Sequence, residues 1–437
     1  MYKTFEKLNN IKKYISRLFF CADGKLKNTG LYYLLIFSVC ITYSLTGCGK
    51  RPPADQTPQM DTSPDFFIRV RLLKDMTEAV ITSSTNLNII SDTGEGKKYN
   101  SKLNITLFNN QLKINNDIFT GKKFEVKTSS PNIFSINDQS YRGYLKLIID
   151  PEKNTFSAIN IVPLEPYLTG VIGAEMPDYW EPQALKAQTI TARTYCLYIK
   201  KRFGTGRDYD MRKSQANQVY KGIDAESEQV WNAVNETKGM VLTCRQTDGS
   251  ENIFPTYYSS TCGGHTEDSK NVFGDDFPAL KGVPCQYCKN VAKPKYYFWP
   301  SVKFDHKTVT ERLLNRYSSL EKLEDIVDIA IKKQTVYTNF TRVTAVELIG
   351  VNGKTDWLRA EDFRLAIDPS GRKIKSTIFK LTKEDDGWLF QSGRGFGHAV
   401  GMCQCGAQAM ARQGADFKRI LEYYYPGSKI IDVYNNN

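Results

Sequence analysis

The sequence has no basic cluster with interleaved aromatic residues and no nucleic-acid-binding motif, so a DNA or RNA partner is not expected. Histidine is scarce, with three residues among 437, and no internal repeat stands out. What is present is ordinary for a globular protein: 41% hydrophobic and 24% charged residues, which excludes a disordered or fibrous chain. The length allows two or three domains.

The positive charge is concentrated at the start of the chain. Residues 1–30 contain seven basic and two acidic side chains, so they account for +5 of the net charge of +12. The remaining +7 suits an anionic wall or membrane surface, and is equally compatible with a general role in solubility. An apolar run of about fifteen residues follows this basic segment, which is short for a membrane-spanning helix and typical of a signal peptide.

The apolar run ends in LTGC (45–48), which resembles the lipobox of bacterial lipoproteins. This resemblance implies that residues 1–47 are a signal peptide and that Cys48 is acylated, anchoring an exported protein to a membrane of the cell envelope. The alternative is an uncleaved anchor helix. Both interpretations predict export, to the periplasm or the outer face of the membrane.

The mature chain reads as a tether followed by an α+β protein. Residues 48–66 are polar and proline-rich, as a tether should be. Alternating strands predicted at 68–72, 79–82, 103–107 and 144–149 indicate a small β-rich N-terminal domain over 67–160. Further strands and helices indicate an α+β core over 161–300, an α/β insertion or subdomain over 301–390, and a C-terminal part of the core over 391–437.

Within the core, apolar spacing predicts helices over 182–201 and 226–238, followed by a hairpin of strands 240–243 and 253–254. In the insertion we expect helices over 309–316 and 323–333 and strands over 343–348 and 378–381. A Gly/Ala-rich helix is expected over 401–414.

Several runs, in order over residues 135–430, resemble the stage II sporulation protein D (SpoIID) family, which also contains the LytB amidase modifiers. They are VPLEPYLTGVIGAEMP (162–177), ALKAQTITARTY (184–195), NQVYKG (217–222), AVNETKG (233–239), YYSSTCGG (257–264) and GRGFGHAVGMCQCGA (393–407). The resemblance implies a SpoIID-type catalytic core and lytic transglycosylase activity on peptidoglycan, which cuts between N-acetylmuramic acid and N-acetylglucosamine and leaves a 1,6-anhydro end. The rival hypotheses are a non-catalytic glycan-binding stimulator of a cell-wall amidase and a purely structural, zinc-stapled envelope protein.

Glu175 is the candidate acid and base. It lies in an otherwise uncharged run, and such surroundings disfavour the charged carboxylate and raise its pKa toward that of a working acid. A lytic transglycosylase can work with one carboxyl group, because the same group returns as the base that accepts the proton of the sugar's 6-hydroxyl. The alternative is a helix-capping or ion-pairing role.

The family-like runs also supply candidate substrate-binding residues. In the family context Arg193 is expected to orient the carboxylate or to bind acyl groups of the sugar, and Gln218 and Tyr220 to lie on one side of a strand for hydrogen bonding and stacking. His398, in a glycine-rich run, is the strongest imidazole candidate, because Ser259 stands where some family members have His. Structural roles are the alternatives for each. The full predicted set is Gln188, Arg193, Gln218, Tyr220, Tyr258, His398 and Gln404.

Cysteines form a second group. Seven remain after Cys21, Cys40 and Cys48 are set aside, so complete pairing in disulfides would leave one over. The pairs Cys262-x₂-His265 and Cys285-x₂-Cys288 have the spacing of a closed, structural zinc site. The rival is a disulfide between Cys288 and either Cys285 or Cys262, which an oxidising exterior favours. We expect catalysis itself to require no cofactor.

Overall fold

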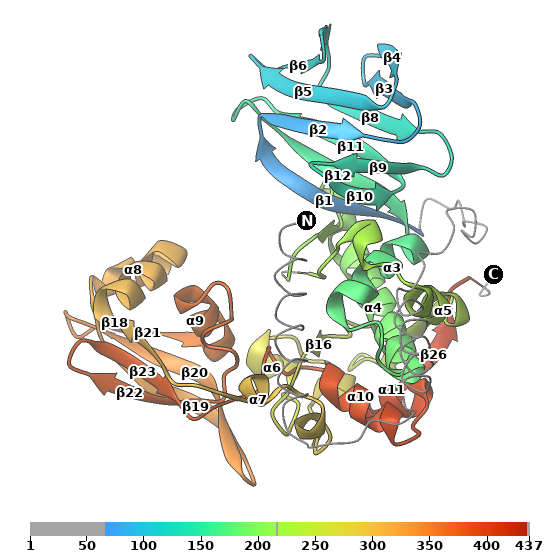
Figure 1. Cartoon of the computed structure of the whole chain (residues 1–437). Helices are drawn as coiled ribbons and strands as arrows, with labels where there is room; N and C mark the ends of the chain where they lie inside the picture. Colours follow the sequence, from blue (N-terminus) through green and yellow to red (C-terminus); the bar gives the residue numbers. More distant parts are fainter. Residues whose placement is uncertain (1–65, 216, 435–437) are drawn as a thin grey trace, which may run out of the picture. The chain divides into compact units, whose positions relative to one another are not determined.

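The computed structural model describes residues 66–215 and 217–434, which form a mixture of helices and strands (Figure 1). The α+β class predicted from the sequence is confirmed. The predicted signal peptide, the acylation site Cys48 and the tether up to residue 65 lie outside the described residues. Within the described part, no helix has the length and apolar character needed to cross a membrane.

Two sheets, antiparallel except for the parallel pairing of one edge strand (Met211–Arg212) with the strand beside it, are built largely from residues 67–163. Several of their strands alternate between buried and exposed positions, as in β5 (Lys102–Phe108), because successive side chains point to opposite faces. The predicted strands are confirmed. One sheet has the order β13-β1-β12-β11-β8-β3-β4 and contains β1 (Phe67–Met76), β3 (Leu87–Ser91), β4 (Gly96–Tyr99), β8 (Lys123–Thr128), β11 (Tyr144–Asp150), β12 (Thr155–Pro163) and β13 (Met211–Arg212). The other has the order β10-β9-β2-β5-β6-β7 and contains β2 (Glu78–Thr82), β5 (Lys102–Phe108), β6 (Gln111–Ile114), β7 (Asp117–Phe119), β9 (Ile133–Ile136) and β10 (Gln139–Arg142).

Helix α4 (Pro182–Phe203) is the centre of the helical core. Pro182 begins it, where a missing N–H costs no hydrogen bond, and the helix is buried along much of its length. It contacts α3 (Leu164–Glu175), α5 (Glu228–Glu236), α10 (Gln404–Arg412) and α11 (Phe417–Tyr424), and also β14 of a small sheet. That sheet has the order β15-β14-β26, with strands β14 (Met240–Arg245), β15 (Glu251–Ile253) and β26 (Ser428–Asp432). The predicted helices and hairpin of this region are confirmed.

Helix α3 packs closely against the chain at residues 220–225, part of which is the 3₁₀ turn η3 (Gly222–Ala225). Gly170 and Gly173 lie three residues apart on the contacting face. A Cβ atom on Gly170 would meet the ring of Tyr220, and one on Gly173 would meet the carbonyl of Ala225. Glycine at both positions therefore permits this approach, which fixes the C-terminal end of α3 and so the position of Glu175.

The region around 300–390 has a hydrophobic cluster of its own, which includes Trp299, Phe363 and Phe390. Its elements are β18 (Val302–Asp305), α8 (His306–Arg316), η6 (Ser318–Leu323), β19 (Ile326–Tyr337), β20 (Phe340–Gly350), β21 (Thr355–Arg359), α9 (Ala360–Ile367), β22 (Lys380–Glu384) and β23 (Gly387–Gln391), with strand orders β18-β23-β22 and β19-β20-β21.

One predicted helix in this region, over 323–333, is wrong. The residues form strand β19, whose pairing with β20 shifts register at three places, the first between Ile326 and Asp328. Such bulges break the two-residue alternation of a strand. Ile326 and Ile329 are buried three residues apart, a spacing that imitates a helix.

Short elements connect the core segments. They are η2 (Gly204–Gly206), β16 (Tyr258–Ser259), α6 (Ser269–Val272), η4 (Pro278–Leu280), η5 (Cys288–Asn290), α7 (Pro294–Tyr297), β17 (Phe298–Trp299), β24 (Gly393–Arg394) and β25 (Met402–Cys403). Strand β16 pairs in parallel with β25, so residues from the middle and the end of the chain lie side by side. Because β25 occupies residues 402–403, the helix predicted over 401–414 begins only at Gln404.

Candidate functional site

Glu175 is the last residue of α3, and one oxygen of its carboxylate accepts a backbone hydrogen bond. The backbone N–H of Val219 donates to Oε1 at 2.8 Å. Burial raises the pKa of Glu175 to about 7, against the opposing effects of the Val219 hydrogen bond and the Tyr258 hydroxyl. The C-terminal end of a helix carries partial negative charge, which adds to the cost of ionisation. The carboxyl group is therefore close to half protonated at neutral pH.

Three predicted residues lie around Glu175. Gln404, the first residue of α10, donates from Nε2 to the backbone carbonyl of Glu175 at 3.3 Å and to Oε1 of Gln188 at 3.4 Å. Strand β16 contributes Tyr258, whose hydroxyl affects the carboxylate but is buried without a partner at hydrogen-bond geometry in the described part. Buried donors without partners are uncommon in folded proteins. The Tyr258 hydroxyl can thus donate a hydrogen bond to the Glu175 carboxylate.

Gln218 and Tyr220 face the same side, as predicted, but that side is the protein interior. Gln218 accepts a hydrogen bond from the Tyr167 hydroxyl at 2.9 Å and donates to the carbonyl of Ala192 at 3.1 Å. Tyr220 donates to Asn160 Oδ1 at 2.9 Å. Both side chains are buried, so the prediction that they bind sugar directly is wrong. Their role is to fix Val219 between them, and with it the N–H that binds Glu175.

Arg193 also has a structural role. It is fully buried and makes a two-pronged ion pair with Glu165, from Nε at 3.0 Å and from Nη2 at 2.6 Å. Nη1 donates to the carbonyl of Met240. The guanidinium is buried and its donors are used by Glu165 and the Met240 carbonyl. The prediction that Arg193 contacts a sugar or the Glu175 carboxylate is therefore wrong.

His398 is held as a neutral imidazole. Its Nδ1 accepts from the backbone N–H of Val400 at 3.0 Å, and its ring packs edge-on against Phe273. Burial lowers its pKa to about 4, and nearby Glu361 only partly offsets this effect. In the described part no hydrogen bond joins His398 to Glu175. A catalytic role for this imidazole stays a prediction.

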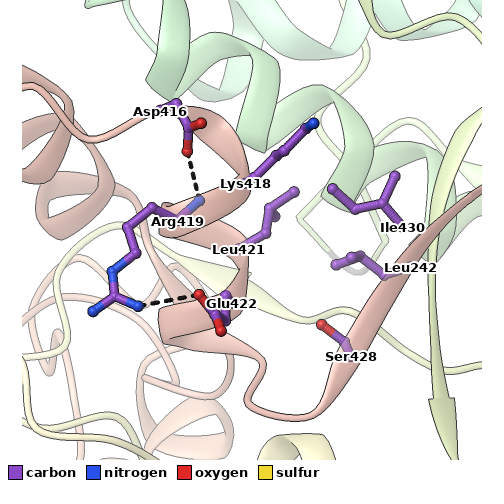
Figure 2. Close-up of a pocket in the computed structure, with 8 residues that line it drawn as sticks. All are labelled: Leu242, Asp416, Lys418, Arg419, Leu421, Glu422, Ser428 and Ile430. Carbon is purple, nitrogen blue, oxygen red and sulfur yellow. Dashed lines mark hydrogen bonds and ion pairs between the residues drawn. The ribbon is translucent and has the colours of Figure 1, made fainter.

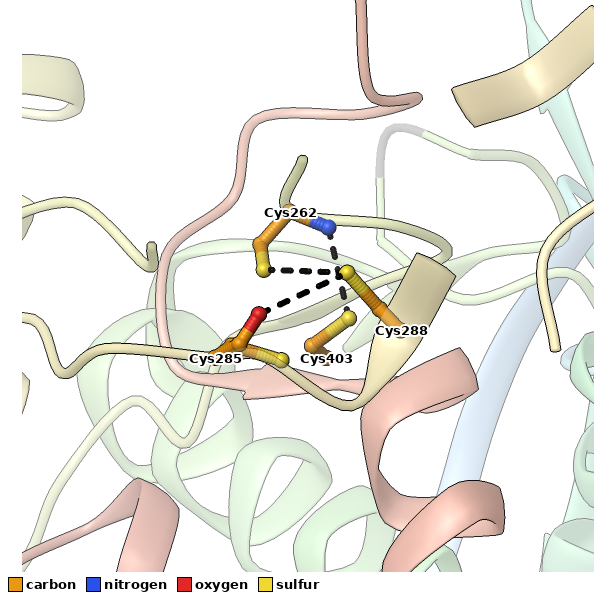
Figure 3. A group of neighbouring side chains, drawn as sticks. All are labelled: Cys262, Cys285, Cys288 and Cys403. Carbon is orange, nitrogen blue, oxygen red and sulfur yellow. Dashed lines mark hydrogen bonds between the residues drawn. The ribbon is translucent and has the colours of Figure 1, made fainter. Parts of the chain in front are cut away.

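Four cysteines meet in the interior, at a place that the sequence predicted only in part (Figure 3). Cys262, Cys285, Cys288 and Cys403 are buried, with sulfur atoms all within 4.8 Å of one another. His265 is not among them: its Nδ1 lies 2.6 Å from the carbonyl of Thr266 and its ring stacks on Tyr337. The prediction that His265 belongs to this group is therefore wrong, and Cys403 takes its place. No disulfide joins the cysteines of the described residues, so the alternative pairing is not present either.

Sequence reasoning missed two contributors. The sequence pointed only weakly to Cys403: seven cysteines, an odd number, follow Cys48, and no partner for Cys403 could be chosen among them. Val219 left none, because it acts through a backbone N–H that any residue except proline would supply.

A surface pocket elsewhere contains none of the predicted site residues (Figure 2). Two of its charged side chains, Arg419 and Glu422, form an ion pair at 3.1 Å, and Asp416 accepts a hydrogen bond from the backbone N–H of Arg419. Its lining is Leu242, Asp416, Lys418, Arg419, Leu421, Glu422, Ser428 and Ile430.

The chain is similar to known proteins over the region that contains Glu175. The family model of SpoIID, stage II sporulation protein, matches residues 152–244. An uncharacterized protein of Brachyspira hyodysenteriae is 31% identical over 299 residues, which are 68% of this chain and 74% of that protein. Stage II sporulation protein D of Bacillus subtilis is 29% identical, over 63% of this chain and 76% of its own length. The amidase enhancer of Bacillus subtilis is 28% identical over 77% of this chain, which spans only half of that relative. The chain belongs to the SpoIID family.

Proposed function

We propose that this protein is a lytic transglycosylase of peptidoglycan and that Glu175 is its acid and base. The observation that carries the proposal is the state of this carboxyl group: a backbone N–H holds one oxygen, and burial places the pKa near 7. A group that must donate and then accept a proton works best with a pKa near the pH at which it operates.

Protonated Glu175 first donates its proton to O4 of N-acetylglucosamine as the bond to C1 of N-acetylmuramic acid breaks. The 6-hydroxyl of the muramic acid residue then attacks C1, and the Glu175 carboxylate accepts the hydroxyl proton. A C–O bond breaks, a C–O bond forms, and the carboxyl group regains its proton. No water is consumed and no second carboxylate is needed, unlike the usual pair in glycoside hydrolases.

The surrounding residues support both proton transfers. The N–H of Val219 stabilises the carboxylate after the first transfer through its hydrogen bond to Oε1. Gln404 fixes the end of α3 through the Glu175 carbonyl. The Tyr258 hydroxyl, which has no hydrogen-bond partner among the described residues, can donate to the carboxylate when it is charged.

The direct test is digestion of purified peptidoglycan by the purified protein, with mass spectrometry of the released fragments. We expect fragments ending in 1,6-anhydro-N-acetylmuramic acid. Fragments with reducing ends would instead indicate hydrolysis, and no fragments at all would contradict the proposal.

A second candidate function is stimulation of a cell-wall amidase by a non-catalytic glycan-binding protein. It is favoured by the relative named amidase enhancer, which this chain matches over 381 residues. This function predicts glycan binding without anhydro products, and stimulation of a purified amidase that survives neutralisation of Glu175.

We also propose that the protein is exported and held at the cell envelope by a lipid on Cys48, where its substrate lies.

The pH dependence of cleavage provides a further test. Because the reaction begins with protonated Glu175, we expect kcat/KM to fall about tenfold per pH unit above about pH 7. His398, with a pKa of about 4, is neutral throughout this range, so His398→Asn should leave this decline in place. A pH profile measured on soluble glycan strands checks both points. A decline centred near 4.5, the ordinary pKa of a glutamate side chain, would mean that the reacting carboxyl group is not the buried one.

A further inference from the structure

The four buried cysteines come from three segments of the chain. Cys262 follows strand β16, Cys285 and Cys288 form a turn ending in η5, and Cys403 lies in β25. The sulfur atoms of Cys262 and Cys288 are 3.7 Å apart. A tetrahedron with Zn–S bonds of about 2.3 Å has edges of about 3.8 Å between sulfur atoms. We propose that these four thiolates bind one structural zinc ion.

The surroundings suit thiolates in a closed site. The backbone N–H of Gly264 points to the sulfur of Cys262 at 3.4 Å, and that of Cys262 to the sulfur of Cys403 at 3.3 Å. The hydroxyl of Tyr424 lies 3.2 Å from the sulfur of Cys285. Such donors stabilise metal-bound thiolates and orient them. With four protein ligands and full burial, no position is left for water, as in structural rather than catalytic zinc sites.

A buried guanidinium lies beside the cluster. Zinc with four thiolates has a net charge of −2. Arg342 is fully buried and its Nη2 donates to the carbonyl of Cys262 at 2.7 Å, while Nε and Nη1 have no hydrogen-bond partner in the described part. Its nearest carboxylate is Glu267, at 3.6 Å from Nε. Arg342 thus places positive charge beside the turn that supplies the first ligand.

A disulfide explains the cluster less well. A disulfide bond is about 2.05 Å long, far shorter than the 3.7 Å between the sulfur atoms of Cys262 and Cys288. Joining any two of the four would also leave two buried thiols beside it. One zinc ion satisfies all four at once, and bound thiolates are protected from oxidation outside the cell.

The ion would connect the strands that build the Glu175 site. Cys403 precedes Gln404, which holds the Glu175 carbonyl, and Ser259, beside Tyr258 in β16, pairs with Cys403. This consequence rests on the proposed function, whereas zinc binding itself does not. Metal analysis therefore tests the zinc site, and glycan cleavage tests the proposed function, and either proposal can be contradicted without the other.

The test is metal analysis of the purified full chain and of single variants. We expect about one zinc per chain in the unchanged protein and near zero after Cys403→Ser. His265→Ala and Cys405→Ser are matched controls, because both residues come from the same runs but lie outside the four-sulfur group, and both variants should keep the zinc. Zinc retained by Cys403→Ser, or lost from His265→Ala, would overturn the proposed ligand set.

If Cys403→Ser does not fold, binding of Co²⁺ by the unchanged chain tests the four-cysteine site instead. The unchanged chain, reduced and refolded with Co²⁺, should develop the intense thiolate-to-cobalt absorption of a four-sulfur tetrahedral site, saturating at one equivalent. Zinc should abolish this absorption. An intact chain that gains no such band, or whose mass shows two hydrogens missing for a disulfide among these cysteines, would overturn the proposal.

Discussion

Replacing Glu175 with glutamine should lower the rate of anhydro-product formation by about 10²- to 10⁴-fold, the usual contribution of a positioned acid and base. Glutamine keeps the size of the side chain, and its amide oxygen can still accept the Val219 N–H. It has no proton to give to O4 and cannot accept one from the 6-hydroxyl. The loss should therefore appear in kcat, with glycan binding little changed.

Asp178→Asn is the matched control, because it makes the same chemical change three residues away on an exposed side chain. This variant should cleave glycan at the unchanged rate. Mass spectrometry of timed digests, with the rate normalised to folded protein, measures both. Undiminished anhydro products from Glu175→Gln would exclude the proposed role and leave stimulation of an amidase as the better hypothesis.

The same substitution should stabilise the fold above neutral pH. The pKa of Glu175 is raised in the folded protein, from 4.5 to about 7, so ionisation favours the unfolded chain. Stability from this group is present below pH 4.5 and is lost as the pH rises through about 7. The difference of about 2.5 units corresponds to about 3 kcal/mol. Urea unfolding at about pH 8 should show Glu175→Gln to be more stable by up to this amount, with no gain at about pH 4.

Arg193→Met should cost about 3–5 kcal/mol of unfolding free energy, because it leaves Glu165 buried without its cationic partner. The remaining side-chain donor to Glu165 is the hydroxyl of Tyr434, at 2.9 Å. Urea unfolding followed by circular dichroism measures the loss. A matched control is Arg419→Met, which breaks an exposed pair with Glu422 and should cost at most about 1 kcal/mol.

A double variant separates pairing from packing. Adding Glu165→Met to Arg193→Met removes the stranded carboxylate and should recover part of the lost stability, since buried ion pairs can be replaced by apolar side chains. If Arg193→Met instead left stability unchanged while raising KM for glycan, the substrate-binding role predicted from the sequence would be restored.

Local patterns in the sequence predicted much of this structure. Pro182 and the apolar spacing after it predicted α4, and alternation predicted the N-terminal strands, because both signals depend on neighbouring residues only. Glu175 was selected by its uncharged neighbours and by family-like runs, and burial does raise its pKa.

Most of the failures involve contacts between distant segments. Arg193 and Tyr220 are residue types that bind sugars, but their partners, Glu165 and Asn160, were not identifiable without the fold. His265 had the spacing of a zinc ligand, whereas Cys403 reaches the cluster only through the pairing of β16 with β25. Bulges in β19 gave a strand the apolar spacing of a helix.

The bond from Gln404 to the Glu175 carbonyl spans 229 positions of the chain. Polypeptides are made and threaded across membranes from the N-terminal end, so α3 emerges long before α10 and β26. A growing chain thus contains Glu175 without Gln404, without β25 beside Tyr258, and without the last strand of the β14 sheet. A chain that stops before residue 404 therefore lacks the contact that holds the end of α3, although it already contains the carboxyl group proposed to react.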